Sequence, residues 1–403
     1  MNRFESVNIE TNPKLGFYTV GQNVYYSKVQ ALIESTKTGE FPHWNFNNNV
    51  YGAQVWTEEP EESLATLYQQ RAQQLRDQYD YIRLECSGGA DSTQTLFSFV
   101  LNGIHIDEIV FRYPKTGTEK LDVTLNYEAK SHLLEYEYAT RPLLEWVKVN
   151  CPEVKITVHD YSNDMLVNED RDESWVFSAK EFLQPAHVTK FPNYQTIEHK
   201  YLADSGKRIC VLYGIDKPKM CIRDGEWYAY FMDFQANYAN PDMGEYTNIT
   251  NEYFYWSPDL PAITVKQAHT IRNWFNDPAN QHLQHLARWP NHSVAQRTAY
   301  EQMIKPLIYP DYDHLTFQVG KPGSNFYSEM DEWFYQQFQD HKLYRSWMAG
   351  INFVETQIDP KFFNREFGRA VGFIGFLTPF YSIGPAQQKQ RVKHYGIELA
   401  DRF

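Results

Sequence analysis

Residues 81–103 read YIRLECSGGADSTQTLFSFVLNG, a pattern that changes character twice. Its first six residues are a short, mostly apolar run of the kind that forms a buried strand. From residue 91 the apolar side chains have helical spacing, and Gly103 is a stop signal for that helix. Two adjacent glycines lie between these parts. The pattern therefore predicts a strand, a glycine-containing loop and a helix in succession.

The same alternation continues along the chain. Three more strand patterns follow: IDEIVFRY at 106–113, VKITVHDY at 154–161 and RICVLYGI at 208–215. The stretch 125–149 is mainly helical, with an interruption expected at Pro142 because proline lacks an amide donor. Strands that alternate with helices at this spacing predict an α/β fold with a doubly wound, mostly parallel sheet over residues 80–235.

Residues 1–79 precede this sheet domain as an N-terminal extension. They end in EESLATLYQQRAQQLRDQY, in which apolar side chains recur at helical spacing: Leu64, Leu67, Tyr68, Ala72, Leu75 and Tyr79. Thr57 and Pro60 supply start signals for this helix. Its apolar stripe is expected to pack on the domain that follows.

The end of the sheet domain and the rest of the chain have different patterns. In MCIRDGEWYAYFMD, at 220–233, an Asp-Gly pair between two apolar runs predicts a β-hairpin. Residues 236–403 are rich in aromatic and polar side chains, with helices expected at 260–275 and 328–341. We expect this part to be a mainly helical subdomain that covers the open end of the sheet.

Charge and cysteine content exclude several classes of protein. A net charge of -13, from 38 Lys and Arg against 51 Asp and Glu, disfavours nucleic acid and anionic membranes as partners. The four cysteines include no CxxC pair, so their spacing indicates no zinc or iron–sulfur site. The N-terminus has no apolar signal segment, and no window approaches the roughly 18 apolar residues of a membrane span. We expect a cytoplasmic protein.

The loop between the first strand and its helix has the chemistry of a phosphate site. A helix N-terminus presents unpaired amides and the positive end of its dipole. Gly88 and Gly89 allow a phosphate to approach the backbone closely, and Ser87 and Ser92 add hydroxyl donors. Asp91 fits either as a ligand to a Mg²⁺ ion that bridges phosphates or as the cap of the helix.

This loop carries a resemblance to a known superfamily. Its six residues, Ser87-Gly88-Gly89-Ala90-Asp91-Ser92, match the motif SGGxDS, and the chain resembles the PP-loop ATP pyrophosphatases. These adenine nucleotide alpha hydrolase-like proteins include the asparagine, GMP and NAD synthetase domains and the PAPS reductase-like proteins. The resemblance implies ATP and Mg²⁺ as cofactors, with the six loop residues on the nucleotide and Asp91 on the metal. It also implies cleavage between the α and β phosphates, transfer of AMP to a substrate oxygen, and a loop that holds the pyrophosphate.

Two more groups of residues follow strands at the same sheet edge. By resemblance, Phe111 and Arg112 lie near the adenine; the alternative is that Phe111 is core and Arg112 a surface charge. After the fourth strand, the resemblance places Gly214 against the nucleotide. It makes Lys217 and Lys219 the cations that act, together with Asp91, on the reacting phosphate. Arg223 is a further candidate for that role, and a solvated loop is the alternative.

Absent residues narrow the chemistry that the resemblance allows. No cysteine follows Cys221, which argues against a cysteine-dependent sulfonucleotide reductase. Residues 1–79 are too few for a glutaminase domain, so ammonia would come free, from an amine substrate or from a separate partner. We therefore expect an AMP-forming ligase or amidotransferase-like enzyme that adenylates a carbonyl or carboxylate oxygen of a small-molecule acceptor. A nucleotide-binding module without catalysis and an enzyme that modifies nucleic-acid bases remain alternatives.

Overall fold

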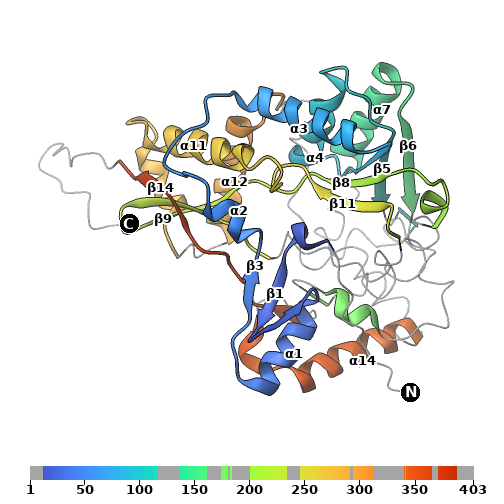
Figure 1. The fold of residues 1–403 in the computed structure, drawn as a ribbon, viewed down its shortest axis with the longest axis vertical. Helices are drawn as coiled ribbons and strands as arrows, with labels where there is room; N and C mark the ends of the chain where they lie inside the picture. Colours follow the sequence, from blue (N-terminus) through green and yellow to red (C-terminus); the bar gives the residue numbers. More distant parts are fainter. Residues whose placement is uncertain are drawn as a thin grey trace, which may run out of the picture.

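Five parallel strands form the central sheet of the computed structural model (Figure 1). The structure describes residues 12–113, 115–116, 136–160, 174–179, 182–183, 200–233, 246–290, 294–312, 340, 342–364 and 371–387. The strand order is β11-β8-β4-β5-β6, and every neighbouring pair is parallel. The strand bounds are β4 Tyr81–Glu85, β5 Glu108–Tyr113, β6 Lys155–Asp160, β8 Ile209–Tyr213 and β11 Ile249–Tyr253. The prediction of an α/β fold with a parallel sheet is confirmed.

The sheet grows in two directions from β4. The chain first adds β5 and β6 on one side, then returns to add β8 and β11 on the other. In the register of the sheet, Arg83 of β4 lies beside Glu108 of β5 and beside Val211 of β8. Consequently the carboxyl ends of β4 and β8 are neighbours, at the point where the winding reverses.

Strand β11 was not predicted from the sequence, and it lies beyond residue 235. Its central residues, Asn251 and Glu252, are polar but buried. Glu252 accepts hydrogen bonds from Arg71 at 2.9 Å and from the hydroxyl of Tyr79 at 2.7 Å. A buried carboxylate requires such partners, and residues from a distant part of the sequence supply them.

Three helices cover one face of the sheet: α3 Leu64–Gln78, α4 Ala90–Val100 and α7 Arg141–Asn150 (Figure 1). Phe97 of α4 contacts Trp146 of α7, with ring centroids 5.2 Å apart, and Ile82 and Leu84 of β4 belong to the same core. A smaller core is formed by other strand and helix residues: Leu202, Ile209, Val211 and Ile249. Apolar side chains on both faces explain why the strands read as nearly continuous apolar runs.

The start of one predicted helix needs correction, and the structure describes only part of another. Helix α3 begins at Leu64, and not near Thr57 or Pro60, because the Ser63 hydroxyl caps it by accepting from the Thr66 amide. Helix α7 follows a π-helical turn, η3 Tyr136–Thr140, and Pro142 stands in its first turn. Proline is favourable there, since the first amides of a helix have no intrahelical partner. The change from π-helical to α-helical hydrogen bonding falls between Thr140 and Arg141, next to Pro142. The start of the stretch predicted at 125–149 lies outside the described residues, which omit 117–135.

The predicted hairpin is confirmed. Strands β9 Lys219–Arg223 and β10 Glu226–Tyr230 are antiparallel, and β14 Tyr381–Pro385 pairs with β10 to complete a three-stranded sheet. The two turn residues, Asp224 and Gly225, have φ of 51° and 80°. Two positive φ angles are what a tight two-residue hairpin requires, which is why Asp-Gly occurs there.

The N-terminal residues form a small sheet of their own in the order β2-β1-β3. Its elements are η1 Pro13–Leu15, β1 Phe17–Val20, β2 Asn23–Tyr25, α1 Lys28–Thr38, β3 His43–Asn45 and α2 Asn48–Gly52. Helix α1 contacts α14 Lys342–Gln357, so an N-terminal helix packs against a helix from the C-terminal part of the chain (Figure 1).

The remaining described elements come from the middle and the C-terminal part of the chain. They are η4 Ser174–Ser178, β7 Phe182–Leu183, α11 Ala262–Asn276, η6 Gln281–Ala287, α12 Val294–Ile308, η7 Pro360–Phe362, β12 Phe363–Asn364 and β13 Val371–Phe373. Helix α11 confirms the helix predicted at 260–275 and packs against both α3 and α12. The helix predicted at 328–341 lies outside the described residues, apart from residue 340.

Candidate functional site

Two loops meet where the winding of the sheet reverses. One connects β4 to α4 and contains Ser87, Gly88 and Gly89, and the other follows β8 and begins at Gly214. Doubly wound sheets bind their ligands outside the carboxyl ends of the strands at such a reversal. Both loops were singled out from the sequence, and the topology of the sheet makes them neighbours.

The first loop requires glycine at residue 88. Gly88 has a φ of +70°, which side-chain-bearing residues rarely adopt. A Cβ on Gly88 would lie 2.6 Å from Thr140 Oγ1 and 2.7 Å from Thr140 Cα. The Thr140 hydroxyl also donates a hydrogen bond of 3.0 Å to the carbonyl of Ser87. The loop is therefore held between the end of β4 and the turn that precedes α7.

Helix α4 begins directly after this loop. Gly89 is its N-cap and supplies no side-chain cap, and the first helical hydrogen bond runs from the Thr93 amide to the Gly89 carbonyl. The amides of residues 90–92 precede that bond and have no intrahelical partner, so they are available to an anion. Asp91 lies in the first turn but does not cap the helix, which leaves its carboxylate to other contacts.

The second loop packs directly on the start of α4. A Cβ on Gly214 would lie 2.9 Å from the carbonyl carbon of Asp91 and 3.0 Å from Ser92 Cα. Only a residue without a side chain permits this approach. The contact brings the residues after Gly214 over the first turn of the helix, and Lys217 reaches Asp91 from there.

Alternating charges form a chain at this contact. The Lys217 ammonium lies 2.8 and 2.9 Å from the two carboxylate oxygens of Asp91 and 3.1 Å from Asp216 Oδ1. The Lys219 ammonium lies 3.1 Å from Asp216 Oδ2 and 3.1 Å from Glu301 Oε1. Asp216 thus bridges the two lysines that the sequence singled out. We call these five residues the charge chain.

Each inner member of the charge chain keeps its charge. Burial by itself would lower the pKa of Lys217, but the carboxylates of Asp216 and Asp91 outweigh it and raise the pKa above its usual range. Burial would raise the pKa of Asp216, but the two neighbouring lysines hold it well below its usual range. The Lys217 side chain is 8% exposed and that of Asp91 is 26% exposed, so solvent reaches the chain from the Asp91 side.

Two tyrosine hydroxyls complete the surroundings of Asp91. The Tyr309 hydroxyl donates to Asp91 Oδ1, and the Tyr255 hydroxyl donates to the Asp91 carbonyl at 2.9 Å. Burial, followed by the negative charge of Asp91, raises the pKa of Tyr309 well above its usual value, so this hydroxyl stays protonated. Gln94 and Asp311 hold the segment after α12 in place through reciprocal hydrogen bonds of 2.8 and 3.0 Å.

Sequence reasoning missed Thr140, Tyr255, Glu301 and Tyr309. None of them belongs to a motif. Thr140 is the nearest of the four in sequence, and it lies 48 residues after Ser92, the last residue of the SGGADS motif. In a chain with 29 tyrosines, no sequence signal separates Tyr255 or Tyr309 from tyrosines of the core. Their positions follow from packing alone.

Other residues predicted for the site lie farther out. Phe111 is buried and stacks on Tyr136, with ring centroids 5.6 Å apart. Arg112 forms an ion pair of 2.8 Å with Glu85 at the end of β4. These contacts suit either alternative given above, so a role with adenine remains a prediction. Arg223 lies at the hairpin turn, where it pairs with Asp224, at the opposite end of β9 from Lys219.

Phosphate and magnesium fit this site differently. The amides of residues 90–92 and the glycine backbone suit phosphate oxygens. A Mg²⁺ ion, by contrast, is usually held at about 2.0–2.1 Å by one or two carboxylate oxygens together with waters and substrate phosphates, and both oxygens of Asp91 already accept from Lys217. Within the described ranges, no three His, Cys, Asp or Glu residues form a metal-ligating group. As the side chains lie, Mg²⁺ does not fit at Asp91, and direct ligation by this residue remains a prediction.

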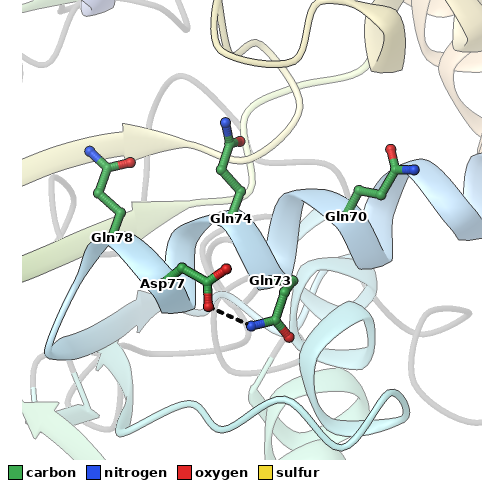
Figure 2. A pocket seen from close by; sticks show the side chains of 5 residues that line it. All are labelled: Gln70, Gln73, Gln74, Asp77 and Gln78. Atoms are coloured by element: carbon green, nitrogen blue, oxygen red, sulfur yellow. Dashed lines mark hydrogen bonds between the residues drawn. The ribbon is translucent and has the colours of Figure 1, made fainter.

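A shallow surface depression lies elsewhere, along the outer side of α3 (Figure 2). Four glutamines and one aspartate line it: Gln70, Gln73, Gln74, Asp77 and Gln78. Gln73 donates a hydrogen bond of 2.7 Å to Asp77. Uncharged amides with a single carboxylate suit neither a phosphate nor a metal ion. The lining of the depression therefore indicates no binding site for either.

No family model matches the chain, and no curated protein matches it either. Among the helices in the described part of the chain, none has both the length and the apolar character needed to cross a membrane.

Removing the hydroxyl of Tyr309 tests how much the tyrosine contact stabilises the site. Tyr309→Phe is expected to lower the free energy of unfolding by about 1.5–3 kcal/mol, because a partly buried hydrogen bond to a charged group is lost. Urea unfolding followed by circular dichroism measures the change. The matched control is Tyr300→Phe on α12, since the buried Tyr300 hydroxyl makes no hydrogen bond to any described residue. A Tyr309 variant no less stable than the Tyr300 variant would contradict this account.

Proposed function

We propose that the protein binds ATP through residues 87–92 and cleaves it between the α and β phosphates. The AMP would pass to a carbonyl or carboxylate oxygen of a small-molecule acceptor, which an amine or ammonia then attacks. The observation that carries the proposal is the complete SGGADS loop at the reversal point of a parallel sheet, with Gly214 packed against it and Lys217 beside it.

Electrostatics constrain how a polyphosphate enters. The charge chain contains two lysines and three carboxylates, so its members nearly balance one another and leave no surplus of positive charge. An incoming polyphosphate must therefore draw an ammonium away from its carboxylate or arrive with a cation of its own. We propose Mg²⁺ as the cation that accompanies ATP, and we assign it no protein ligand.

The chemistry would proceed in two displacements. An acceptor oxygen attacks the α-phosphorus, the bond from that phosphorus to the α–β bridging oxygen breaks, and its electron pair leaves with pyrophosphate. The amides at the start of α4 would hold the leaving pyrophosphate, while Lys217 and Lys219 balance its charge. An amine or ammonia then attacks the carbon that bears the adenylated oxygen. AMP departs with the electron pair of the carbon–oxygen bond, and the nitrogen releases a proton to solvent.

The identity of the products tests the proposal. Purified protein is incubated with Mg²⁺ and ATP labelled at the α-phosphate, alone and with pooled amino acids, nucleosides or tRNA. We expect labelled AMP together with pyrophosphate, and the pool that accelerates their release gives the class of acceptor. The variant Asp91→Ala/Ser92→Ala should abolish the reaction.

Other outcomes separate the alternatives. Labelled ADP would refute cleavage between the α and β phosphates. Tight ATP binding without any turnover would favour a nucleotide-binding module that lacks catalysis. Stimulation by tRNA alone would favour an enzyme that modifies nucleic-acid bases, against the expectation from the net charge of -13.

A further inference from the structure

The Lys217 ammonium occupies a position that resembles a cation site. Three carboxylate oxygens from two residues surround it: both oxygens of Asp91, at 2.8 and 2.9 Å, and Asp216 Oδ1, at 3.1 Å. Oxygen ligands from two carboxylates at one point are also what a hard divalent cation selects. Here the positive charge comes from the chain itself.

The surrounding residues hold the ammonium in this position. Gly214 packs on Asp91 and Ser92, which fixes the start of the loop that carries Lys217. Asp216 is held on its other side by Lys219, whose ammonium lies 3.1 Å from Asp216 Oδ2. The placement of Lys217 therefore depends on buried contacts of the backbone and of neighbouring side chains.

Asp91 has little remaining capacity for a metal ion. One of its oxygens accepts from Lys217 and from Tyr309, and the other accepts from Lys217. A divalent cation that bound at Asp91 would have to displace the ammonium and would meet its repulsion at short range. Neutralising the ammonium removes this repulsion and leaves two carboxylates facing one point, which itself favours uptake of a cation.

We propose that Lys217 is an internal cation that closes Asp91 to divalent metal ions, and that loss of its ammonium turns Asp91 and Asp216 into a metal site. This inference concerns the protein and the metal alone and does not depend on ATP cleavage. It also predicts that metal enters the site only when another anion, such as a polyphosphate, takes up the ammonium.

Titration with Mn²⁺ alone tests the inference, with the free ion followed by electron paramagnetic resonance. We expect no saturable binding at Asp91 in the wild-type protein. Lys217→Met should gain one Mn²⁺ per chain with an affinity about tenfold or more above any wild-type site, because the repulsion of a unit charge at short range is removed. Asp91→Asn/Lys217→Met should lose this site. About 0.15 M salt suppresses diffuse binding to the acidic surface.

A matched control tests whether any carboxylate that loses its ion-pair partner would bind Mn²⁺. Lys266 pairs with the single carboxylate of Glu59 at 2.8 Å, so Lys266→Met frees one carboxylate elsewhere and should gain no Mn²⁺ site. A folded Lys217→Met protein, judged by near-ultraviolet circular dichroism, that binds no more Mn²⁺ than wild type overturns the inference.

A second comparison keeps the test decisive if Lys217→Met does not fold. The wild-type protein and Asp91→Asn should bind Mn²⁺ identically, because Asp91 is closed in the wild type. Weaker binding by Asp91→Asn would show that Asp91 already holds metal and would overturn the inference.

Discussion

Asp233→Asn is expected to lower the free energy of unfolding by about 3–5 kcal/mol, the usual cost of breaking a buried ion pair from one side. Asp233 lies 2.8 Å from the Lys28 ammonium, and both side chains are 0% exposed. The Tyr18 hydroxyl donates to the same carboxylate oxygen at 2.6 Å, and the Phe376 amide donates to the other oxygen at 2.9 Å. An asparagine amide would turn one of these acceptors into a donor and would remove the charge that faces Lys28.

The change is measured by urea unfolding, with Asp80→Asn as the matched control. Asp80 also pairs with a cation, Arg208, at 2.7 Å, but both side chains are largely exposed, and water replaces the lost contact. We expect the Asp80 variant to remain close to wild type. Equal losses in the two variants would mean that the buried pair contributes no more than a surface pair does.

The Lys28–Asp233 ion pair connects parts of the chain that are distant in sequence. Lys28 is the first residue of α1, whereas Asp233 follows β10, and Phe376 belongs to the C-terminal part. Three segments that are distant in sequence meet at one carboxylate. A large loss of stability in Asp233→Asn would show that the N-terminal extension folds as part of the same unit as the hairpin.

Gly88→Ala is expected to weaken ATP binding about ten- to hundredfold. Its Cβ would overlap the backbone of Thr140, with a distance of 2.7 Å to Thr140 Cα. Shifting the loop to relieve such an overlap costs about 1–3 kcal/mol. The shift would also move the amides at the start of α4 away from the phosphates that they are proposed to bind.

Isothermal titration of ATP into the variants measures this effect, and Gly103→Ala is the matched control. Gly103 has a φ of +68°, nearly that of Gly88, but a Cβ there would meet no atom within 4 Å. The two substitutions share the same backbone strain and differ in the contact with Thr140. Normal ATP affinity in Gly88→Ala, or an equal loss in Gly103→Ala, would contradict the role of the loop.

Local patterns predicted much of the fold. Four strands of the central sheet and the hairpin follow from apolar runs and from the Asp-Gly turn, both of which are encoded within a few residues. Strand β11 could not be found in this way, because ITNEY has three polar residues between its apolar ends. Glu252 is stable there because Arg71 of α3 and Tyr79, directly after α3, donate hydrogen bonds to it, and these contacts exist only in the folded chain.

The candidate site was likewise predicted only in part. The loop after β4, Gly214 and the two lysines were identified from the sequence, since the motif and the strand ends mark them. The pairing of Lys217 with Asp91 was not expected, because sequence patterns place residues on a loop but do not assign their partners. The Tyr309 contact depends on the docking of α12, and the Tyr255 contact depends on the pairing of β11 with β8. Both are long-range events that local patterns do not encode.

A crystal structure of the protein with α,β-methylene ATP and Mg²⁺ shows whether residues 87–92 hold the phosphates of ATP. This analogue has no cleavable bridge between the α and β phosphates and so keeps the nucleotide intact. The account predicts that the β and γ phosphates lie on the amides of residues 88–92 and that Lys217 turns from Asp91 toward them. Phosphates bound away from this loop, or a nucleotide that leaves the loop untouched, would contradict it.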